Sequence, residues 1–260
     1  MNGLEIRSAR ALRPAQRAEL FNAGYEGYLI PFQVDVSTLE FMDDAFDLDL
    51  DASRIAFRDG EPVGLGNLGV RGEDAWIGGV GVVSAARRSG IGEALMRALH
   101  EQARECGVRR VWLEVIFENT GAFALYEKLG YRTVRDVAVW SLPTLEDDGS
   151  AAREVSAAEA QARIRELGGT REPWQRADGT IANYGNARGL VTDNGAALFR
   201  VGGAVQLLQM AGDAEPLLRS LRTLGAVSIL NLPDDDPAAS ALRSLGATVV
   251  IRQHEMLLQL

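Results

Sequence analysis

The stretch Val82–Tyr131 reads VVSAARRSGIGEALMRALHEQARECGVRRVWLEVIFENTGAFALYEKLGY and predicts a strand end, a glycine turn, a helix, a strand and a second helix. The turn Arg87-Arg88-Ser89-Gly90-Ile91-Gly92 lies between apolar Val82–Val83 and an amphipathic helix over Glu93–Cys106. Glycines let the backbone approach an anion, and the free N–H groups of a helix's first turn favour a phosphate or pyrophosphate. The turn therefore predicts a diphosphate site.

Two motifs in this stretch resemble those of the GNAT superfamily, the acyl-CoA-dependent N-acyltransferases. The family's pyrophosphate loop, [QR]-x-x-G-x-[GA], is matched by Arg87, Gly90 and Gly92. Its second signature, N-x-x-A-x-x-L-Y-x-K-x-G-[FY], is matched by Asn119, Ala122, Leu125, Tyr126, Lys128, Gly130 and Tyr131. The resemblance implies an α/β fold, a mixed twisted sheet flanked by helices. It also implies acetyl-CoA as co-substrate.

The resemblance also implies roles for individual residues. In the family, the strand that ends at Val82 and Val83 bonds the pantetheine arm and faces the thioester carbonyl, and Arg87 adds charge to the loop. Tyr126 matches the family's usual general acid, and its unperturbed pKa of ~10, above the ~8.5 of a thiol, keeps it protonated near neutral pH. The implied cofactor-binding residues are Val82, Val83, Arg87, Arg88, Ser89, Gly90, Ile91, Gly92, Glu93, Asn119 and Tyr126.

Glu114, in Leu113-Glu114-Val115, is the candidate general base. Some N-terminal-amine acetyltransferases of the family carry a glutamate at this position that acts through water. A carboxylate within an apolar strand is costly to bury unless it faces a wet cleft. The alternative is an ion pair with Arg109 or Arg110, and both interpretations stay open. Glu73 and Asp74, in a predicted turn, are weaker candidates.

Three further features have a structural and a functional interpretation. Tyr25, Tyr28, Phe32 and Phe41 either line the acceptor pocket or seal the N-terminal helices to the sheet, and we expect at least one of them in the pocket. Cys106 ends the helix far from the predicted thioester, which argues against an acyl-cysteine intermediate. Gly64–Gly69 is a literal G-x-G-x-x-G, but a turn between strands follows it, so we reject a dinucleotide site.

Composition sets the outer limits of these predictions. The 260 residues are 47% hydrophobic and 24% charged, as in an ordinary soluble protein, and no apolar run approaches the ~18 residues of a membrane span. A net charge of −9 argues against nucleic acid and mildly favours a cationic partner. One cysteine excludes an internal disulfide, and two scattered histidines provide no metal-ligand spacing. We expect a cytoplasmic protein without a metal, and we make no prediction of its oligomeric state.

The C-terminal half contains a degenerate repeat of the N-terminal half. Val227–Leu260 runs parallel to Val111–Thr144 in its predicted strands, helix and glycine stop. The chemistry is not repeated, because Leu242 replaces Tyr126, and Asp213 stands where the glycine loop should be. We therefore predict a catalytic domain over 1–145 and, after the polar linker Pro143–Ser150, a GNAT-like domain over 146–260 that lacks the CoA loop.

The predicted reaction is direct transfer of an acetyl group from acetyl-CoA to a primary amine in a ternary complex. A small, cationic acceptor is favoured. The alternatives are a protein N-terminus or a lysine as acceptor, a different acyl group, or a non-catalytic acyl-CoA sensor whose second domain signals to a partner. Retention of Tyr126 and Glu114 argues against the sensor, because the degenerate copy has lost both.

Overall fold

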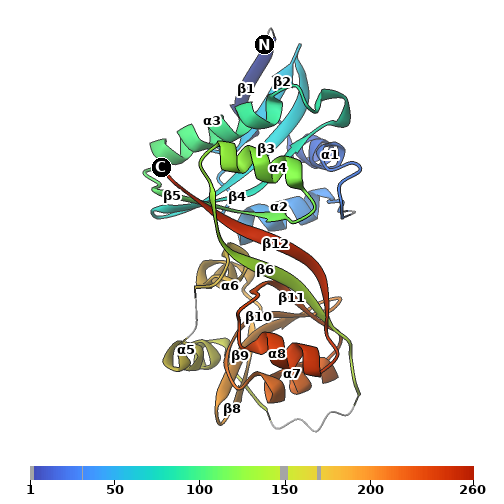
Figure 1. Cartoon of the computed structure of the whole chain (residues 1–260), viewed down its shortest axis with the longest axis vertical. Helices are drawn as coiled ribbons and strands as arrows, with labels where there is room; N and C mark the ends of the chain where they lie inside the picture. The colour runs from blue at the N-terminus through green and yellow to red at the C-terminus, as the bar shows by residue number, and fades with distance from the viewer. Residues whose placement is uncertain (1–2, 31, 147–151, 169–170) are drawn as a thin grey trace. The chain divides into compact units, whose positions relative to one another are not determined.

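The computed structural model describes residues 3–30, 32–146, 152–168 and 171–260. They form two compact units, one with the chain up to Val134 plus Glu255–Leu260, the other with Arg135–His254 (Figure 1). Each unit is an α/β structure in which helices flank a mixed sheet, and this confirms the predicted fold class. The functional division into 1–145 and 146–260 stays a prediction, and residues 147–150 of the predicted linker lie outside the described residues.

The first unit is an antiparallel meander followed by one parallel strand. In order of pairing its strands are β1 (Leu4–Ser8), β2 (Arg54–Arg58), β3 (Glu61–Arg71), β4 (Asp74–Val82) and β5 (Arg110–Ile116), and the end of β12 follows β5. Asp59-Gly60, a dipeptide typical of hairpin turns, joins β2 to β3, and both residues have positive φ. A helix crosses between β4 and β5, as a parallel pair requires.

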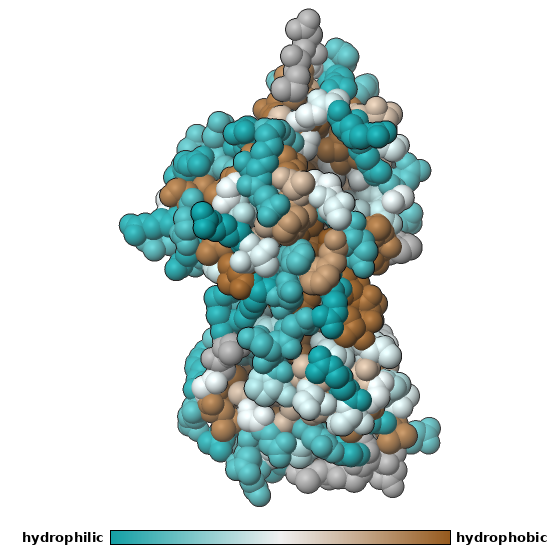
Figure 2. Space-filling view, viewed as in Figure 1, coloured by the Kyte–Doolittle hydropathy of each residue, from teal (hydrophilic) through white to brown (hydrophobic). Residues whose placement is uncertain are grey.

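Helices cover both faces of this sheet. They are α1 (Pro14–Gly24), α2 (Val36–Ala45), α3 (Ile91–Glu105) and α4 (Thr120–Lys128), with short 3₁₀ turns at Ala9–Ala11 and Ser84–Ala86. Neighbouring residues of β3 point to opposite faces. A Cβ on Gly66 would lie 2.7 Å from Leu99 Cδ1 of α3, whereas Leu65 packs with Phe21 of α1. Thus α3 covers one face and α1 the other, and hydrophilic side chains cover the outward surface of α3 (Figure 2).

The second unit repeats the element order of the first. After β6 (Arg132–Leu142) come β7 (Arg153–Val155), α5 (Ala157–Leu167), the 3₁₀ turn η3 (Trp174–Arg176), α6 (Asp178–Tyr184), β8 (Arg188–Thr192), β9 (Gly195–Val201), β10 (Val205–Gly212), α7 (Ala214–Thr223), β11 (Val227–Pro233), α8 (Ala238–Ser244) and β12 (Thr248–Gln259). Two helical segments, a meander, a helix, a strand, a helix and a strand recur in the same sequence. The predicted repeat is therefore present in the fold.

The two long closing strands are exchanged between the units. Most of β6 belongs to the second unit, where Leu142 pairs with Val227 and Trp140 with Ile229 of β11. Conversely, Glu255–Leu260 of β12 belong to the first unit, and Met256 is fully buried in its core. The sequence pattern of Thr248–Leu260 predicts a pair of strands, and this prediction is wrong, because the structure has one strand there. Each half of the repeat thus completes the sheet of the other.

Candidate active site

Strands β4 and β5 part at the centre of the first unit. In the described chain they pair only over Asp74–Trp76 and Arg110–Trp112, although β4 continues to Val82 and β5 to Ile116. β4 also carries a bulge at Gly78, because Asn67 pairs with Gly79 but the next residue of β3 pairs with Ile77. Beyond the parting, the edge of β4 can bond a ligand in place of a neighbouring strand.

The glycine turn connects this parted edge to the start of α3. Gly90 precedes the first residue of α3 with φ 83°, and no side chain caps the helix. Arg88 also has a positive φ, of 59°. The first N–H groups of α3 are therefore left for an external acceptor, and the helix dipole favours an anion there. This backbone geometry is compatible with a pyrophosphate loop, and the assignment of that role stays a prediction.

Arg87 has a positioning role that the sequence did not indicate. Its Nε donates to the Val82 carbonyl at 2.9 Å, and its Nη2 donates to the carbonyls of Gly24 and Glu26 at 3.1 and 2.6 Å. The guanidinium therefore joins the glycine turn to the end of α1. This contact differs from the predicted contribution of free charge to the diphosphate.

A second arginine reaches the turn from β2. Arg58 Nη2 donates to Ser89 Oγ at 3.1 Å, and Ser89 Oγ donates to the Ala86 carbonyl at 2.6 Å. Arg58 thus adds positive charge beside the predicted anion site. Sequence reasoning missed this residue, because nothing in the pattern of β2 indicates a contact 31 residues further along the chain.

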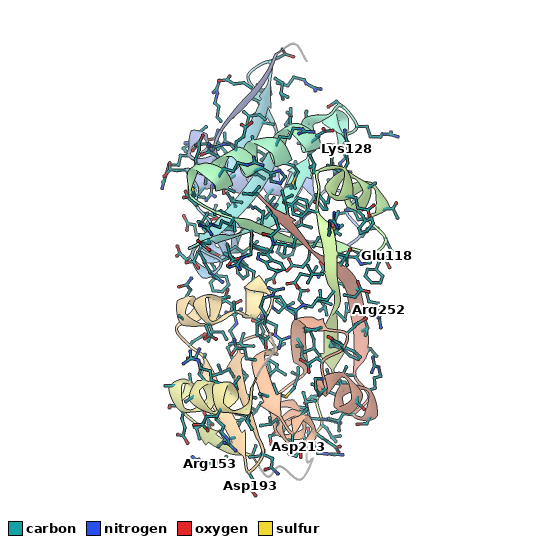
Figure 3. All side chains as sticks on the ribbon, turned by 60° about the vertical axis from the view of Figure 1, so that its left-hand side comes forward. Glu118, Lys128, Arg153, Asp193, Asp213 and Arg252 are labelled. Carbon is teal, nitrogen blue, oxygen red and sulfur yellow. The ribbon has the colours of Figure 1, made fainter. Side chains whose placement is uncertain are left out.

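The carboxylate in the first turn of α3 is neutralised. Glu93 accepts from Lys128 Nζ at 2.6 Å and from Arg97 Nη2 at 2.9 Å, and these two bonds, Lys128 first, lower the pKa of Glu93. Lys128 lies at the end of α4, where Figure 3 labels it. The contact therefore joins α3 to α4 and removes a repulsive charge from the anion site.

Tyr126 lies half-buried on α4 near a second phenol. Burial, followed by the nearby Tyr28, raises the pKa of Tyr126 well above its usual value, so the phenol stays protonated at any working pH. Asn119 begins α4, where its Oδ1 accepts from the Ala122 N–H at 3.2 Å and its Nδ2 is 3.4 Å from Tyr28 Oη. α4 and the segment that follows α1 therefore bring Asn119, Tyr28 and Tyr126 together.

Glu114 lies just beyond the point where β4 and β5 part. One of its carboxylate oxygens accepts a hydrogen bond from Trp76 Nε1 at 2.8 Å. Arg110 forms two 2.7 Å hydrogen bonds to Asp74, and Arg109 lies 3.3 Å from Glu73. The two arginines proposed as structural partners of Glu114 thus pair with the two weaker base candidates instead.

The remaining candidate residues have various surroundings, and the expectation that an aromatic residue lines the acceptor pocket stays a prediction. Gly64–Gly69 lie within β3, where a Cβ on Gly64 would come 3.1 Å from Leu95 of α3, so close packing accounts for that glycine. Cys106 is exposed at the end of α3. Phe32 and Phe41 are 45% and 40% exposed. The described residues contain no group of His, Cys, Asp or Glu that could hold a metal ion, and no helix among them could cross a membrane.

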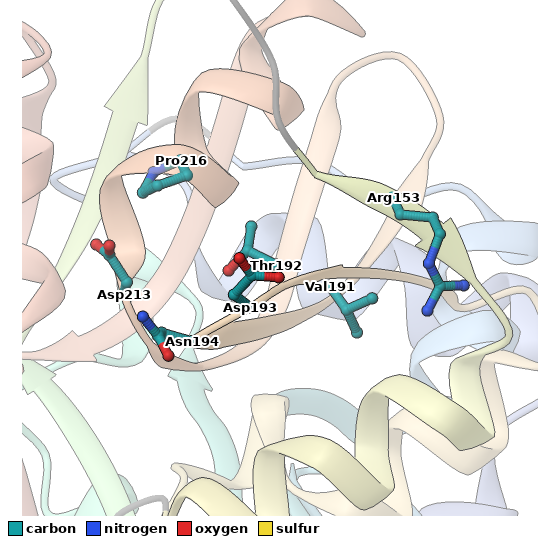
Figure 4. A pocket seen from close by; sticks show the side chains of 7 residues that line it. All are labelled: Arg153, Val191, Thr192, Asp193, Asn194, Asp213 and Pro216. Atoms are coloured by element: carbon teal, nitrogen blue, oxygen red, sulfur yellow. The ribbon is translucent and has the colours of Figure 1, made fainter.

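The corresponding place in the second unit is acidic. A cavity of about 370 Å³ lies at the start of α7, with Asp193, Asn194 and Asp213 at one end and Arg153 at the other (Figure 4). Gly212 could not carry a side chain, because its Cβ would lie 2.0 Å from the Asn194 carbonyl oxygen. Two carboxylates and a closely packed turn thus replace the paired glycines, and this arrangement disfavours a diphosphate.

Comparison with known proteins relates one segment of the chain to a family. Residues 19–131 match the family model described as Acetyltransferase (GNAT) family. A putative acetyltransferase from Pyrococcus horikoshii has a TM-score of 0.73 over 100% of this chain and 90% of that chain, at 21% identity. A tandem GNAT protein from the clavulanic acid biosynthesis pathway has a TM-score of 0.66 over 98% of each chain, at 15% identity. The chain therefore contains a segment that matches the GNAT family model, and its fold is similar to that of these two structures.

The sequence relatives cover a smaller part of the chain. The ribosomal protein bS18-alanine N-acetyltransferase of Escherichia coli (strain K12) is 37% identical over 59 residues, which are 23% of this chain and 40% of that protein. The match thus spans less than half of the relative.

Proposed function

We propose that this protein transfers an acetyl group from acetyl-CoA to a primary amine by direct attack in a ternary complex. The observation that carries the proposal is that β4 and β5 part in the first unit. The uncapped start of α3 and the protonated phenol of Tyr126 complete the candidate site. The α3 N–H groups would hold the diphosphate, with Arg58 and the neutralised Glu93 keeping the local charge favourable. The pantetheine arm would lie along the free edge of β4.

The catalytic step needs two proton transfers, and the site holds one candidate for each. The amine nitrogen attacks the thioester carbon, and its proton passes to Glu114 through water. As the tetrahedral intermediate collapses, the C–S bond breaks and Tyr126 donates its proton to the thiolate. The raised pKa of Tyr126 keeps the phenol protonated until the thiolate forms.

Two acceptor classes have separate support. The net charge of −9 favours a small cationic amine through long-range attraction. A protein N-terminus is supported by the local resemblance to the Escherichia coli enzyme, whose name gives a ribosomal protein alanine as its substrate. The two classes separate in one assay, because a peptide beginning with alanine and a polyamine can be offered to the same preparation.

The first experiment is calorimetric titration of acetyl-CoA into the wild type, Gly90→Glu and Gly107→Glu. Gly90 and Gly107 flank the two ends of α3 and have similar positive φ values, 83° and 77°. Glutamate therefore adds the same charge and similar backbone strain at both, but only Gly90→Glu places the charge at the proposed diphosphate. We expect one site per chain, lost in Gly90→Glu and retained in Gly107→Glu. Equal loss in both variants would contradict the loop assignment, and two sites per chain would contradict the degenerate second domain.

The second experiment measures thiol release over polyamines, aminoglycosides, amino acids and peptides. Tyr126→Phe should lower kcat about 10²-fold while the Kd of acetyl-CoA stays unchanged. Binding of acetyl-CoA without turnover on any amine would favour the sensor over the enzyme. A large loss of acetyl-CoA affinity with intact kcat would remove the acid role from Tyr126.

A further inference from the structure

Tyr25 places its hydroxyl against the bulge of β4. A Cβ on Gly79 would lie only 2.2 Å from Tyr25 Oη, and a Cβ on Gly81 would lie 3.2 Å from the Tyr25 ring. Gly79 also has φ 140°, a conformation that other residues rarely adopt. The Tyr25 ring therefore fits against β4 only because Gly79 and Gly81 have no side chains.

The phenol is rigidly held and remains a donor. The Tyr25 ring stacks on Phe21 with centroids 4.5 Å apart, and the edge of Tyr28 meets it at 5.3 Å. Aromatic contacts of this kind fix the ring plane, so the hydroxyl direction is set before a ligand binds. Burial, followed by the neighbouring Tyr126 and Tyr28, raises the pKa of Tyr25 far above its usual value. Tyr126 contributes to this shift because the two phenols lie near each other.

A buried amide beside Gly79 lacks a hydrogen-bond partner. Asn67 of β3 pairs directly with Gly79, and directly paired residues of antiparallel strands point to the same face. Its side chain is therefore on the face that Tyr25 covers. The Asn67 Nδ2 atom is buried and has no partner among the described residues. An unpaired buried amide is costly, so an acceptor atom is expected here when the site is filled.

In the second unit, side chains of the protein itself occupy the position that corresponds to Tyr25 and the bulge of β4. β10 and β11 also pair only over Val205–Leu207 and Val227–Ile229, and β10 bulges at Leu208. The Leu208 carbonyl accepts from Arg176 Nε at 2.7 Å, and Arg176 is 1% exposed. Arg176 lies between α5 and α6, as Tyr25 lies between α1 and α2. Gln209, at the position of Gly79, bonds the Arg176 carbonyl at 2.8 Å.

We infer that the Tyr25 hydroxyl, with the Asn67 amide beside it, donates a hydrogen bond to the carbonyl oxygen of the bound acyl group. The inference rests on the proposed function. When the amine attacks, the C–N bond forms and the carbonyl π pair moves to oxygen. Tyr25 and Asn67 hold that oxyanion without releasing a proton, and the pair returns as the C–S bond breaks. Donors placed at a developing oxyanion lower the barrier more than they strengthen ground-state binding.

The test is Tyr25→Phe, which removes only the hydroxyl. We expect kcat to fall about 10²-fold, with unchanged Kd values for CoA and for S-ethyl-CoA, a thioether that lacks the carbonyl. Tyr184→Phe in the second unit is the matched control, with wild-type kcat. A kcat within twofold of wild type, or a parallel loss of CoA affinity, overturns the role of Tyr25. If the wild type itself shows no turnover, the proposed function has failed, and the test of Tyr25 is then the Kd of acetyl-CoA against that of S-ethyl-CoA. In that case Tyr25→Phe must raise the Kd of acetyl-CoA and leave the Kd of S-ethyl-CoA unchanged.

Asn67→Leu separates a ligand-binding amide from a structural one. Leucine has a similar shape and removes the unpaired group, so the Tm should rise. For a residue that serves catalysis, kcat should fall about tenfold in the same variant. A raised Tm with unchanged kcat, or a lowered Tm, removes Asn67 from the donor pair. Because the folded state is expected to gain stability, misfolding cannot account for a loss of activity.

Discussion

The indole N–H of Trp76 donates a 2.8 Å hydrogen bond to a carboxylate oxygen of Glu114, joining β4 to β5 just where their pairing ends. Trp76 is the last residue of β4 in register with β5, and Glu114 is two residues beyond its partner Trp112. The first side chain across the parted strands is therefore a carboxylate held in a fixed orientation. A general base needs this kind of orientation.

Glu114→Gln should lower kcat/KM about 10²-fold at pH 7. The amide oxygen of glutamine can still accept from Trp76, so the local packing is kept while the proton acceptor is lost. The deficit should shrink at high pH, where the amine is already deprotonated. Glu118→Gln, an exposed carboxylate in the turn that precedes α4, is the control and should keep wild-type activity. A deficit that is independent of pH would contradict the base role.

Arg87→Lys distinguishes a positioning role of the Arg87 guanidinium from a contribution of its charge to the diphosphate site. Lysine keeps the positive charge but cannot bridge three carbonyls with a planar fork, so the Kd of acetyl-CoA should rise about tenfold. Arg104→Lys, an exposed arginine at the far end of α3, should bind as the wild type does. If the charge of Arg87 were its contribution, Arg87→Lys would bind acetyl-CoA normally in calorimetry.

His100 should make stability depend on pH. Burial, with smaller contributions from Arg104 and Arg97, lowers the pKa of His100 from 6.5 to about 4, and its Nε2 lies 2.9 Å from Tyr131 Oη. Between pH 6.5 and 4 the unfolded chain binds a proton that the folded chain does not. The free energy of unfolding therefore decreases as the pH is lowered from 6.5 to 4, by about 3 kcal/mol for the full shift.

The measurement is urea unfolding of the wild type and His100→Gln at several pH values from 7.5 to 4. Carboxylates contribute equally to both proteins, so the difference between the two curves isolates His100. We expect the variant to lose less stability on acidification. Parallel curves would show that His100 is protonated in the folded protein.

Met256→Ala should destabilise the first unit although it lies five residues from the C-terminus. Met256 is fully buried in the core that holds Met96 and Leu99, and truncation of a buried methionine costs about 2–5 kcal/mol. Val250, on the same strand but 60% exposed, is the matched control, and Val250→Ala should change stability by less than about 0.5 kcal/mol. Equal effects of the two variants in urea unfolding would contradict the strand exchange.

The sequence predicted most of the site because its parts are local. Gly90 before α3 and Asn119 before α4 are backbone positions whose residue types report their conformation directly. The internal repeat could also be predicted from the sequence, because the order of strands and helices is kept in the second copy although its candidate site residues are replaced. The second copy could be predicted as degenerate from Asp213 alone, because a carboxylate and a diphosphate repel each other.

Most of the contacts that the sequence did not predict are long-range. Arg58 meets Ser89 and Arg87 meets Gly24 across 31 and 63 residues, and an arginine at a strand end or in a loop carries no sign of its partner. Trp76 and Glu114 are 38 residues apart, and only the parallel register of β4 and β5 brings them together.

By itself, the sequence determined the resemblance to the GNAT family, the glycine turn before α3, the phenol on α4 and the absence of paired glycines from the second copy. These depend on spacing within one or two elements, where the period of a helix or strand fixes which residues meet. Only the tertiary structure decided which closing strand completes which sheet. β6 and β12 occupy equivalent places in the repeat, so their sequence patterns do not indicate which sheet each strand joins. Pairing between residues far apart in the chain decides it.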